Sequence, residues 1–381
     1  MAIEISHSEI YLDNSATTRV CPAAAEAVMN ALSEEYGNPS SLHDKGYRAE
    51  KLLDLARRQV AGAMGCAPDE LYFSPGGTYS DNAAIFGAAQ SMKRRGKRVV
   101  TTALEHPAVA NCMKRLEEEG FDVVRLPCRE GGHFTGEDLA AALTADTVLV
   151  SVMAVNNETG VVNDVGAVRS AIKAAGSPAL LHCDAVQAFG KLPPSSFMHA
   201  DLVSVSSHKV HGPKGAGALY VRKGVRILPY IFGGGQEKGL FSGTQATPAI
   251  FGFAAACGEF GDIKAEPDRI AALRGAFVSA LSDGDRFSFN SPGDALPYII
   301  NLSVNGVPSE VTVNSLSALG IYVSAGSACH KGKRSDVLSA MGFSAARTDS
   351  AVRVSLSRYT TAEDMERCAD ALKAVSKRSK R

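Results

Sequence analysis

The regular alternation of short apolar strands with helices is the feature that most limits the fold of this chain. Runs rich in Val, Ile, Leu and Tyr recur with helix-like stretches among them; the predicted strands are 71–74, 98–103, 122–126, 147–155, 179–184 and 201–206, and the predicted helices are 80–93, 107–119 and 165–175. Continuous apolar strands of this kind are buried on both faces, so the pattern predicts an α/β fold with a mostly parallel sheet between helices. Ligands of such folds gather at the carboxyl ends of the strands.

The pattern changes after about residue 250. The later part predicts a smaller α/β unit, with helices at 270–283, at 309–319 and from about 361, and strands at 298–304, 321–324 and 352–356. A length of 381 residues suits two domains. We expect a large domain over 16–250, and a small domain made of 1–15 together with 251–381.

Charge and composition exclude several classes of protein. Lys and Arg total 40 and Asp and Glu total 40, so no net charge draws the chain to nucleic acid or to an anionic membrane. No apolar run is long enough to span a bilayer, and the first ten residues do not have the pattern of an export signal. The eight cysteines show no metal-type spacing. We therefore expect a cytoplasmic protein with reduced thiols and no metal.

A glycine turn follows the first predicted strand of the large domain. Residues 74–78, with the sequence SPGGT, open a helix, where free backbone N–H groups and a hydroxyl can bind a phosphate. A tight connection is the simpler alternative for such a turn. Neither a P-loop nor a G-x-G-x-x-G pattern is present, which disfavours a nucleotide.

Two other strand ends carry ionisable groups. Asp184 ends a buried strand, with Gln187 three residues later, and a buried carboxylate requires a positive partner. The segment 206–215 carries Lys209 and Lys214, and a lysine desolvated at the end of a strand is a candidate for forming a Schiff base. An ordinary surface lysine is the alternative for either position.

His106 and the pair Asn156–Asn157 also follow predicted strands. Each of these residues alone is typical of a structural role. Together, the polar strand ends predict one pocket that holds a phosphate, an aromatic ring and an aldehyde-binding lysine. Pyridoxal phosphate has these three features.

The second domain adds a cysteine and an arginine. Cys329 lies in a glycine-containing loop with basic neighbours, which favour a reactive thiolate, although inert buried cysteines are common. Arg353 lies on a predicted strand and would be an unpaired interior cation if it faced the core. The carboxylate of a substrate would satisfy it in a bidentate way.

At this point the chain resembles one family over nearly its whole length: the pyridoxal-phosphate-dependent cysteine desulfurases of the class V aminotransferase group. The motifs that carry the resemblance include YLDNSATT from Tyr11, HCDAVQ from His182, SSHKVHGPKGAGALYV from Ser206 and SAGSACH from Ser324. The resemblance implies a fold-type I transferase whose cysteine loop, about 324–336, belongs to the branch with a long mobile loop. That branch passes sulfur to iron–sulfur scaffold proteins.

The resemblance also implies roles for the residues around the ring. Lys209, and not Lys214, would hold the cofactor as a Schiff base. Asp184 would pair with the ring nitrogen, and Gln187 would bond the oxygen of the ring hydroxyl. His106 would stack on the ring and assist proton transfer.

A second group of residues would hold the phosphate. It consists of Gly77, Thr78, Ser206 and His208, joined by Thr244 from a neighbouring subunit. This last contact requires a homodimer.

The substrate would be L-cysteine, with its carboxylate on Arg353 and with Asn157 contacting both cofactor and substrate. Cys329 would attack the substrate sulfur and keep it as a persulfide, leaving alanine. A sulfur-acceptor protein such as an iron–sulfur scaffold would then take the sulfur.

Three positions depart from the pattern of the family: Pro75 precedes the glycines, Tyr79 replaces a common Glu and Phe241 replaces a common Arg. Two alternatives stay open at this level. One is a selenocysteine or cysteine-sulfinate lyase on the same fold, which would not need Cys329. The other is a redox-regulatory protein that binds the cofactor without turnover.

Overall fold

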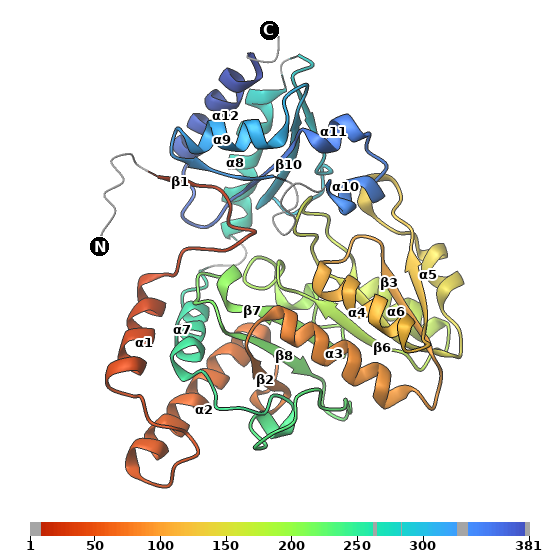
Figure 1. The fold of residues 1–381 in the computed structure, drawn as a ribbon, viewed down its shortest axis with the longest axis vertical. Coiled ribbons are helices and arrows are strands. Elements are labelled where there is room, and N and C mark those ends of the chain that lie inside the picture. Colours follow the sequence, from red (N-terminus) through yellow and green to blue (C-terminus); the bar gives the residue numbers. More distant parts are fainter. Residues whose placement is uncertain (1–8, 262–264, 283, 326–333, 378–381) are drawn as a thin grey trace.

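The computed structural model describes residues 9–261, 265–282, 284–325 and 334–377. Figure 1 shows a larger lower part built on one sheet and a smaller upper part built on a second sheet. The large sheet has the strand order β2-β8-β7-β6-β5-β3-β4. Its strands are β2 (Leu71–Ser74), β3 (Arg98–Thr102), β4 (Asp122–Leu126), β5 (Thr147–Met153), β6 (Leu180–Asp184), β7 (Leu202–Ser206) and β8 (Gly217–Val221).

The direction of the strands confirms the prediction of a mostly parallel sheet. Neighbouring strands from β4 to β7 pair in parallel, whereas β8 is antiparallel to both β7 and β2. The strand that sequence reasoning missed is β8, because its apolar run directly follows a glycine-rich turn. All seven residues of β5 are buried, as expected for a strand near the centre of a covered sheet.

Helices cover this sheet. They are α3 (Gly77–Met92), α4 (Pro107–Glu118), α5 (Gly136–Ala142) and α6 (Val165–Ala174). The last one has a side-chain N-cap, since the Asp164 carboxylate accepts a hydrogen bond from the Ala167 N–H at 2.9 Å. A further helical layer, which the sequence reading did not predict, packs α7 (Thr247–Gly258) against α1 (Pro22–Ser33) and α2 (Asp44–Met64), as Figure 1 shows at the lower left.

The small sheet is antiparallel, with the order β12-β13-β10-β9. Its strands are β9 (Phe287–Phe289), β10 (Ile299–Val304), β12 (Ser324–Ala325) and β13 (Ala351–Ser355), and its helices are α8 (Ala265–Leu281), α9 (Ser309–Ser317), α10 (Asp336–Ala340), α11 (Ala345–Asp349) and α12 (Ala362–Ser376). The predicted helices correspond to α8, α9 and α12, and the predicted strands 298–304 and 352–356 correspond to β10 and β13, whereas β9, α10 and α11 were not predicted.

The N-terminal segment reaches the small sheet region. Strand β1 (Ile10–Tyr11) pairs in parallel with β11 (Ile321–Tyr322), and Asp13 forms a bridge with Ser355. The chain then runs through Ser15 and Ala16 toward α1. The predicted division at residue 250 falls inside α7, and the assignment of domains stays a prediction. No helix in the described ranges is both long and apolar enough to cross a membrane.

Candidate active site

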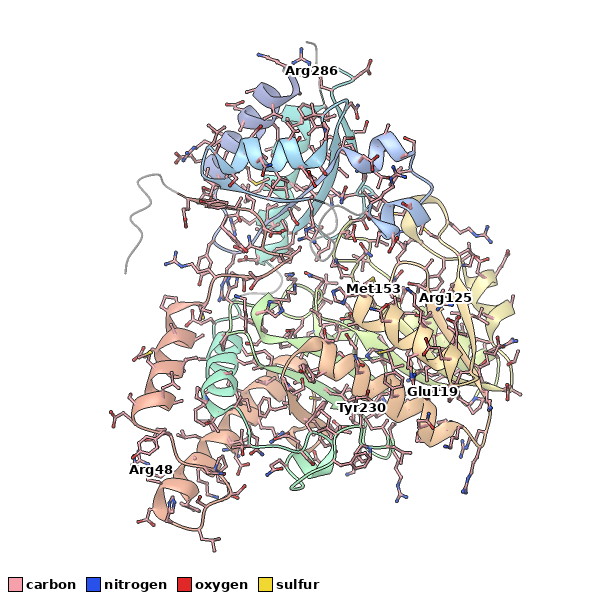
Figure 2. The ribbon with its side chains drawn as sticks, in the orientation of Figure 1. Arg48, Glu119, Arg125, Met153, Tyr230 and Arg286 are labelled. Carbon is pink, nitrogen blue, oxygen red and sulfur yellow. The ribbon has the colours of Figure 1, made fainter. Side chains whose placement is uncertain are left out.

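A cavity of about 540 Å³ lies where the carboxyl ends of the large-sheet strands face β13 and the N-terminal segment. Figure 2 labels Met153, which lines this cavity, near the junction of the upper and lower parts. The predicted site residues that line it are Gly77, Thr78, His106, Asn157, Asp184, Gln187, Ser206, His208, Lys209 and Arg353. These predicted residues, from Gly77 to Arg353, are far apart in the chain but meet in one cavity.

Lys209 follows β7 directly, in a short 3₁₀ turn, Ser207–Lys209. Its ammonium donates hydrogen bonds to the carbonyl oxygens of Ser15 and Ala16, both at 2.7 Å. Lys214 also lines the cavity but is an exposed residue. Of the two candidate lysines, Lys209 is the one that the fold desolvates and holds in place.

One end of the cavity suits a phosphate. Helix α3 begins there at Gly77, and its first N–H groups have no partners within the helix. A Cβ atom at Gly77 would lie 2.8 Å from the Val186 Cγ2 atom, so only glycine fits this close approach. The hydroxyls of Thr78 and Ser206 line the same cavity.

His208 completes this end of the cavity. Its Nδ1 atom lies 3.2 Å from the Thr17 hydroxyl oxygen. Burial, together with the charge of Lys209, lowers the pKa of His208 to about 4, so the ring is neutral at pH 7 and acts there as a hydrogen-bonding group.

The floor of the cavity carries Asp184 at the end of β6. One of its carboxylate oxygens accepts the Val186 N–H at 2.9 Å, and the described part of the chain gives it no ion-pair partner. Burial, followed by the nearby Asp81, raises the pKa of Asp184 to about 7. A protonated ring nitrogen would supply the positive partner that this carboxylate needs, so the residues present fit pyridoxal phosphate.

His106 caps α4, where its Nδ1 atom accepts the Ala108 N–H at 3.1 Å. Burial and the charge of Lys209 lower its pKa to about 4, so the ring is neutral. Because Nδ1 accepts a bond, the proton lies on Nε2. A neutral ring in this place fits stacking against an aromatic cofactor and leaves one N–H to donate.

The expectation that Arg353 is an unpaired interior cation was wrong. This residue is only 1% exposed, but its Nη2 atom contacts a carboxylate oxygen of Asp13 at 2.9 Å. Its Nη1 atom donates to the Asn157 carbonyl at 2.9 Å, and its Nε atom is buried without a hydrogen-bond partner. Since a guanidinium has five N–H donors, the Nε–H and one N–H on each terminal nitrogen remain for a substrate carboxylate.

A buried polar network below the floor was not predicted from the sequence. His182, on β6, lies 2.8 Å from the Ser151 hydroxyl through Nδ1, and through Nε2 it lies 3.0 Å from the Ser204 hydroxyl and 3.5 Å from Asp81. Burial raises the pKa of Asp81 to about 7 and lowers that of His182 to about 4. The available signal was a single carboxylate inside the apolar helix α3.

Two predicted residues remain to be placed. Thr244 is exposed and does not line the cavity. Cys329, with its neighbours over 326–333, lies outside the described residues.

The chain on either side of that segment contacts the site. Ser324 pairs with Arg353 across the small sheet. On the other side, the Ser335 hydroxyl donates to the Glu158 carboxylate at 2.5 Å, and Glu158 lines the cavity. Ser324 and Ser335, the described residues nearest that segment with such contacts, therefore each contact a residue that lines the cavity.

Comparisons with known proteins agree with this geometry. The family model of class V aminotransferases matches residues 10–368. The cysteine desulfurase IscS of Pectobacterium atrosepticum is 40% identical over 367 residues, which are 94% of this chain and 90% of that protein.

Solved structures agree as well. One described as a NifS-like protein has a TM-score of 0.90 and 36% identity, and the match covers 97% of this chain and 99% of that one. Another, described as SspA in complex with cysteine, has a TM-score of 0.81 and 31% identity, and the match covers 93% of this chain and 100% of that one. The fold and site thus define a class V aminotransferase-type protein. Within that class, the chain belongs to the cysteine desulfurase family.

Proposed function

We propose that this protein is a pyridoxal-phosphate-dependent cysteine desulfurase, which converts L-cysteine to L-alanine and keeps the sulfur on Cys329 as a persulfide. The observation that carries the proposal is the single cavity in which Lys209, Asp184 and Arg353 meet. An amine for an aldehyde, a carboxylate for a ring nitrogen and a guanidinium for an amino-acid carboxylate are the groups that this reaction requires.

Different residues would hold the different parts of the cofactor. Lys209 would hold the aldehyde, Asp184 the ring nitrogen and Gln187 the oxygen of the ring hydroxyl. Gly77, Thr78, Ser206 and His208 would hold the phosphate. When bound, the cofactor would withdraw electrons from the α-carbon of the substrate and so make its proton acidic.

The chain's own residues would perform the remaining work. Arg353 and Asn157 would orient L-cysteine, and Lys209 would move the α-proton. The Cys329 thiolate would attack the substrate sulfur, forming an S–S bond as the C–S bond breaks. The carbon that loses sulfur takes up a proton to give alanine, so one thiol and L-cysteine become one persulfide and L-alanine.

We further propose that the protein acts as a homodimer in the cytoplasm and passes its sulfur to an acceptor such as an iron–sulfur scaffold. Large exposed apolar side chains support a dimer, because Phe232 is 83% exposed, and Tyr79, which lines the cavity, is 51% exposed. The cysteines among the described residues are free thiols, which suits a reducing compartment. A persulfide requires an acceptor thiol to complete turnover.

Mass spectrometry after incubation with L-cysteine tests the reaction. We expect one added sulfur atom on the Cys329 peptide of the loaded wild-type protein, together with alanine in solution. Cys128→Ala, which removes a half-buried cysteine distant in sequence, is the matched control and should behave like wild type. Cys329→Ala should form no persulfide and release little alanine.

Two outcomes would count against the proposal. Full alanine release by Cys329→Ala would indicate a lyase that does not use this cysteine. An absorbance band of the bound cofactor that never changes with L-cysteine would indicate a protein that binds without turnover.

A further inference from the structure

Lys191 is a buried cation that the proposed reaction does not use. It follows β6 in a turn and is 8% exposed. Its Nζ atom donates to the side-chain oxygen Oε1 of Gln187 at 2.9 Å. Burial, with the added repulsion of Lys209 and Arg353, lowers the pKa of Lys191 to about 7. A buried ammonium is costly, so its presence beside a cofactor-binding residue calls for a physical reason.

The two neighbours of Gln187 fix which way its amide faces. The Lys191 ammonium can only donate, so it takes the oxygen of the amide. The Ser15 carbonyl can only accept, and it takes the amide nitrogen Nε2 at 3.0 Å. Both contacts require the same orientation. The NH₂ group has two hydrogens, so one remains to donate into the cavity that Gln187 lines.

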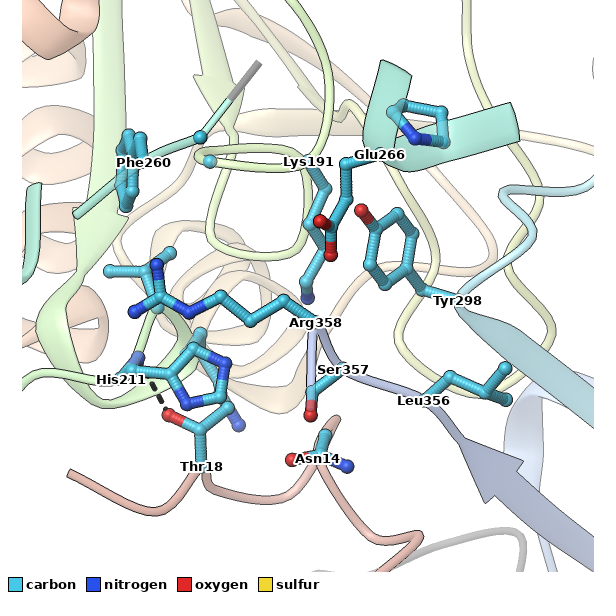
Figure 3. Close-up of a pocket in the computed structure, with 15 residues that line it drawn as sticks. Asn14, Thr18, Lys191, His211, Phe260, Glu266, Tyr298, Leu356, Ser357 and Arg358 are labelled. Carbon is cyan, nitrogen blue, oxygen red and sulfur yellow. Dashed lines mark hydrogen bonds between the residues drawn. The ribbon is translucent and has the colours of Figure 1, made fainter. Parts of the chain in front are cut away.

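A small second pocket lies behind the site and contains the Lys191 side chain. It measures about 50 Å³, and Figure 3 shows Lys191 reaching into it beside Glu266 and Tyr298. This volume can hold a few water molecules, which would hydrate the remaining N–H groups of the ammonium. The Glu266 carboxylate lines the same pocket, and its Oε1 atom lies 3.5 Å from a terminal nitrogen of Arg269. The pocket therefore leaves room for water beside the N–H groups of Lys191 that Gln187 does not accept.

We propose that Lys191 is a positioning residue, which holds the Gln187 amide so that its N–H, and not its carbonyl, faces the cofactor. The inference rests on the proposed function, because it assigns a purpose to Gln187 only when pyridoxal phosphate is bound. A donor on the oxygen of the ring hydroxyl favours the ionised form of that oxygen, and a carbonyl there would repel it. Without Lys191, the Ser15 contact would be the one hydrogen bond among the described residues that opposes rotation of the amide.

Titration of pyridoxal phosphate into the cofactor-free full chain tests this role. For Lys191→Met, which keeps most of the side-chain volume, we expect a dissociation constant about 3- to 30-fold above wild type and a shifted absorbance maximum of the bound cofactor. The unfolding temperature of the cofactor-free variant should be equal or higher, because a buried charge is removed. Lys173→Met, at an exposed lysine of α6, is the matched control and should bind like wild type.

A double-mutant cycle separates an effect through Gln187 from a direct one. In a Gln187→Ala background, Lys191→Met should change neither the dissociation constant nor the spectrum further. The inference would be overturned if the effects of Lys191→Met and Gln187→Ala on the dissociation constant were fully additive. It would also be overturned if Lys191→Met bound the cofactor with the affinity and spectrum of wild type. Should Lys191→Met not fold, Lys191→Gln gives the same comparison, since its amide can accept as well as donate. Failure of the wild-type chain to bind the cofactor at all would overturn the proposed function instead.

Discussion

At the scale of single residues, Arg353 shows how the site balances charge. The guanidinium is buried, and Asp13 neutralises it from one side while the Asn157 carbonyl fixes one of its terminal nitrogens. Its remaining N–H donors include the unpartnered Nε–H. A substrate carboxylate would thus bind a guanidinium that is already held in place, and Arg353 would not need to move for binding.

Replacing Arg353 with Lys tests this arrangement. An ammonium keeps the charge but cannot bond Asp13, Asn157 and a substrate carboxylate with the same fixed geometry. We expect the KM for L-cysteine to rise about tenfold to a hundredfold, as for the loss of a charge-assisted hydrogen bond, while the cofactor spectrum stays unchanged. Arg286→Lys, on the exposed surface labelled in Figure 2, should leave KM unaltered. An unchanged KM in Arg353→Lys would remove this residue from the substrate site.

At the scale of elements, the carboxyl ends of β3 and β5 are joined by the buried Glu105. Its Oε1 atom accepts the Thr102 hydroxyl at 2.7 Å and the Met153 N–H at 3.0 Å, whereas its Oε2 atom has no hydrogen-bond partner. Burial raises the pKa of Glu105 from 4.5 to about 8. The folded protein therefore keeps this side chain protonated at neutral pH, where the unfolded chain would have released the proton.

Because the pKa of Glu105 is raised in the folded protein, the free energy of unfolding falls as the pH rises. The stability that the raised pKa of Glu105 contributes is fully present below pH 4.5, where both the folded and the unfolded chain hold the proton. It is lost as the pH rises to about 8, because the unfolded chain has released the proton while the folded chain still binds it. Glu105→Gln keeps both acceptor bonds and carries no proton to lose. We expect the variant to gain about 1–3 kcal/mol of unfolding free energy over wild type at pH 8, and little at pH 5.

Urea unfolding at the two pH values measures this difference. Glu50→Gln, at an exposed position of α2, should show no such dependence. A constant offset between Glu105→Gln and wild type at both pH values would mean that Glu105 is already ionised in the folded protein.

Elements also show how far the sequence could predict this molecule. The ends of β2 and β4 followed from local patterns, because apolar periodicity is a property of neighbouring residues. The pairing of Asp13 with Arg353 could not be predicted from the sequence, because no local pattern specifies a partner 340 positions away.

The buried network below the site was missed for a related reason. Asp81 and His182 resemble ordinary helix and strand residues until the fold stacks α3 against β6. The cavity-lining residues were found through polar side chains at strand ends, and through the resemblance to a family, which supplied their separate roles.

At the scale of the whole molecule, two departures from the pattern of the family occur together. Tyr79 and Phe241 line the same small pocket of about 160 Å³, with Leu240 and Tyr230. The common Glu is replaced by Tyr79 and the common Arg by Phe241, so the pocket loses one negative and one positive charge together and neither charge remains without its partner. Exposed apolar side chains continue over the adjacent segment, where Tyr230 is 55% and Leu228 is 49% exposed.

This apolar surface is where we expect the second subunit. Phe232→Asp would place a charge in the contact, so sedimentation should show a shift from dimer to monomer. Cofactor retention should fall with it, since Thr244 would no longer reach a neighbouring site. Leu319→Asp, at an exposed leucine after α9, should stay dimeric. A monomeric wild-type protein that retains cofactor fully would contradict this assignment.

The parallel pairing of β1 with β11 has a consequence for biosynthesis. A ribosome releases Asp13 early, but its partner Arg353 emerges only after most of the chain has been translated. The nascent polypeptide can build its large sheet first, yet the pairing of Asp13 with Arg353 can form only near termination. Premature stop products would consequently lack Arg353, even where they retain the complete sheet that leads into Lys209.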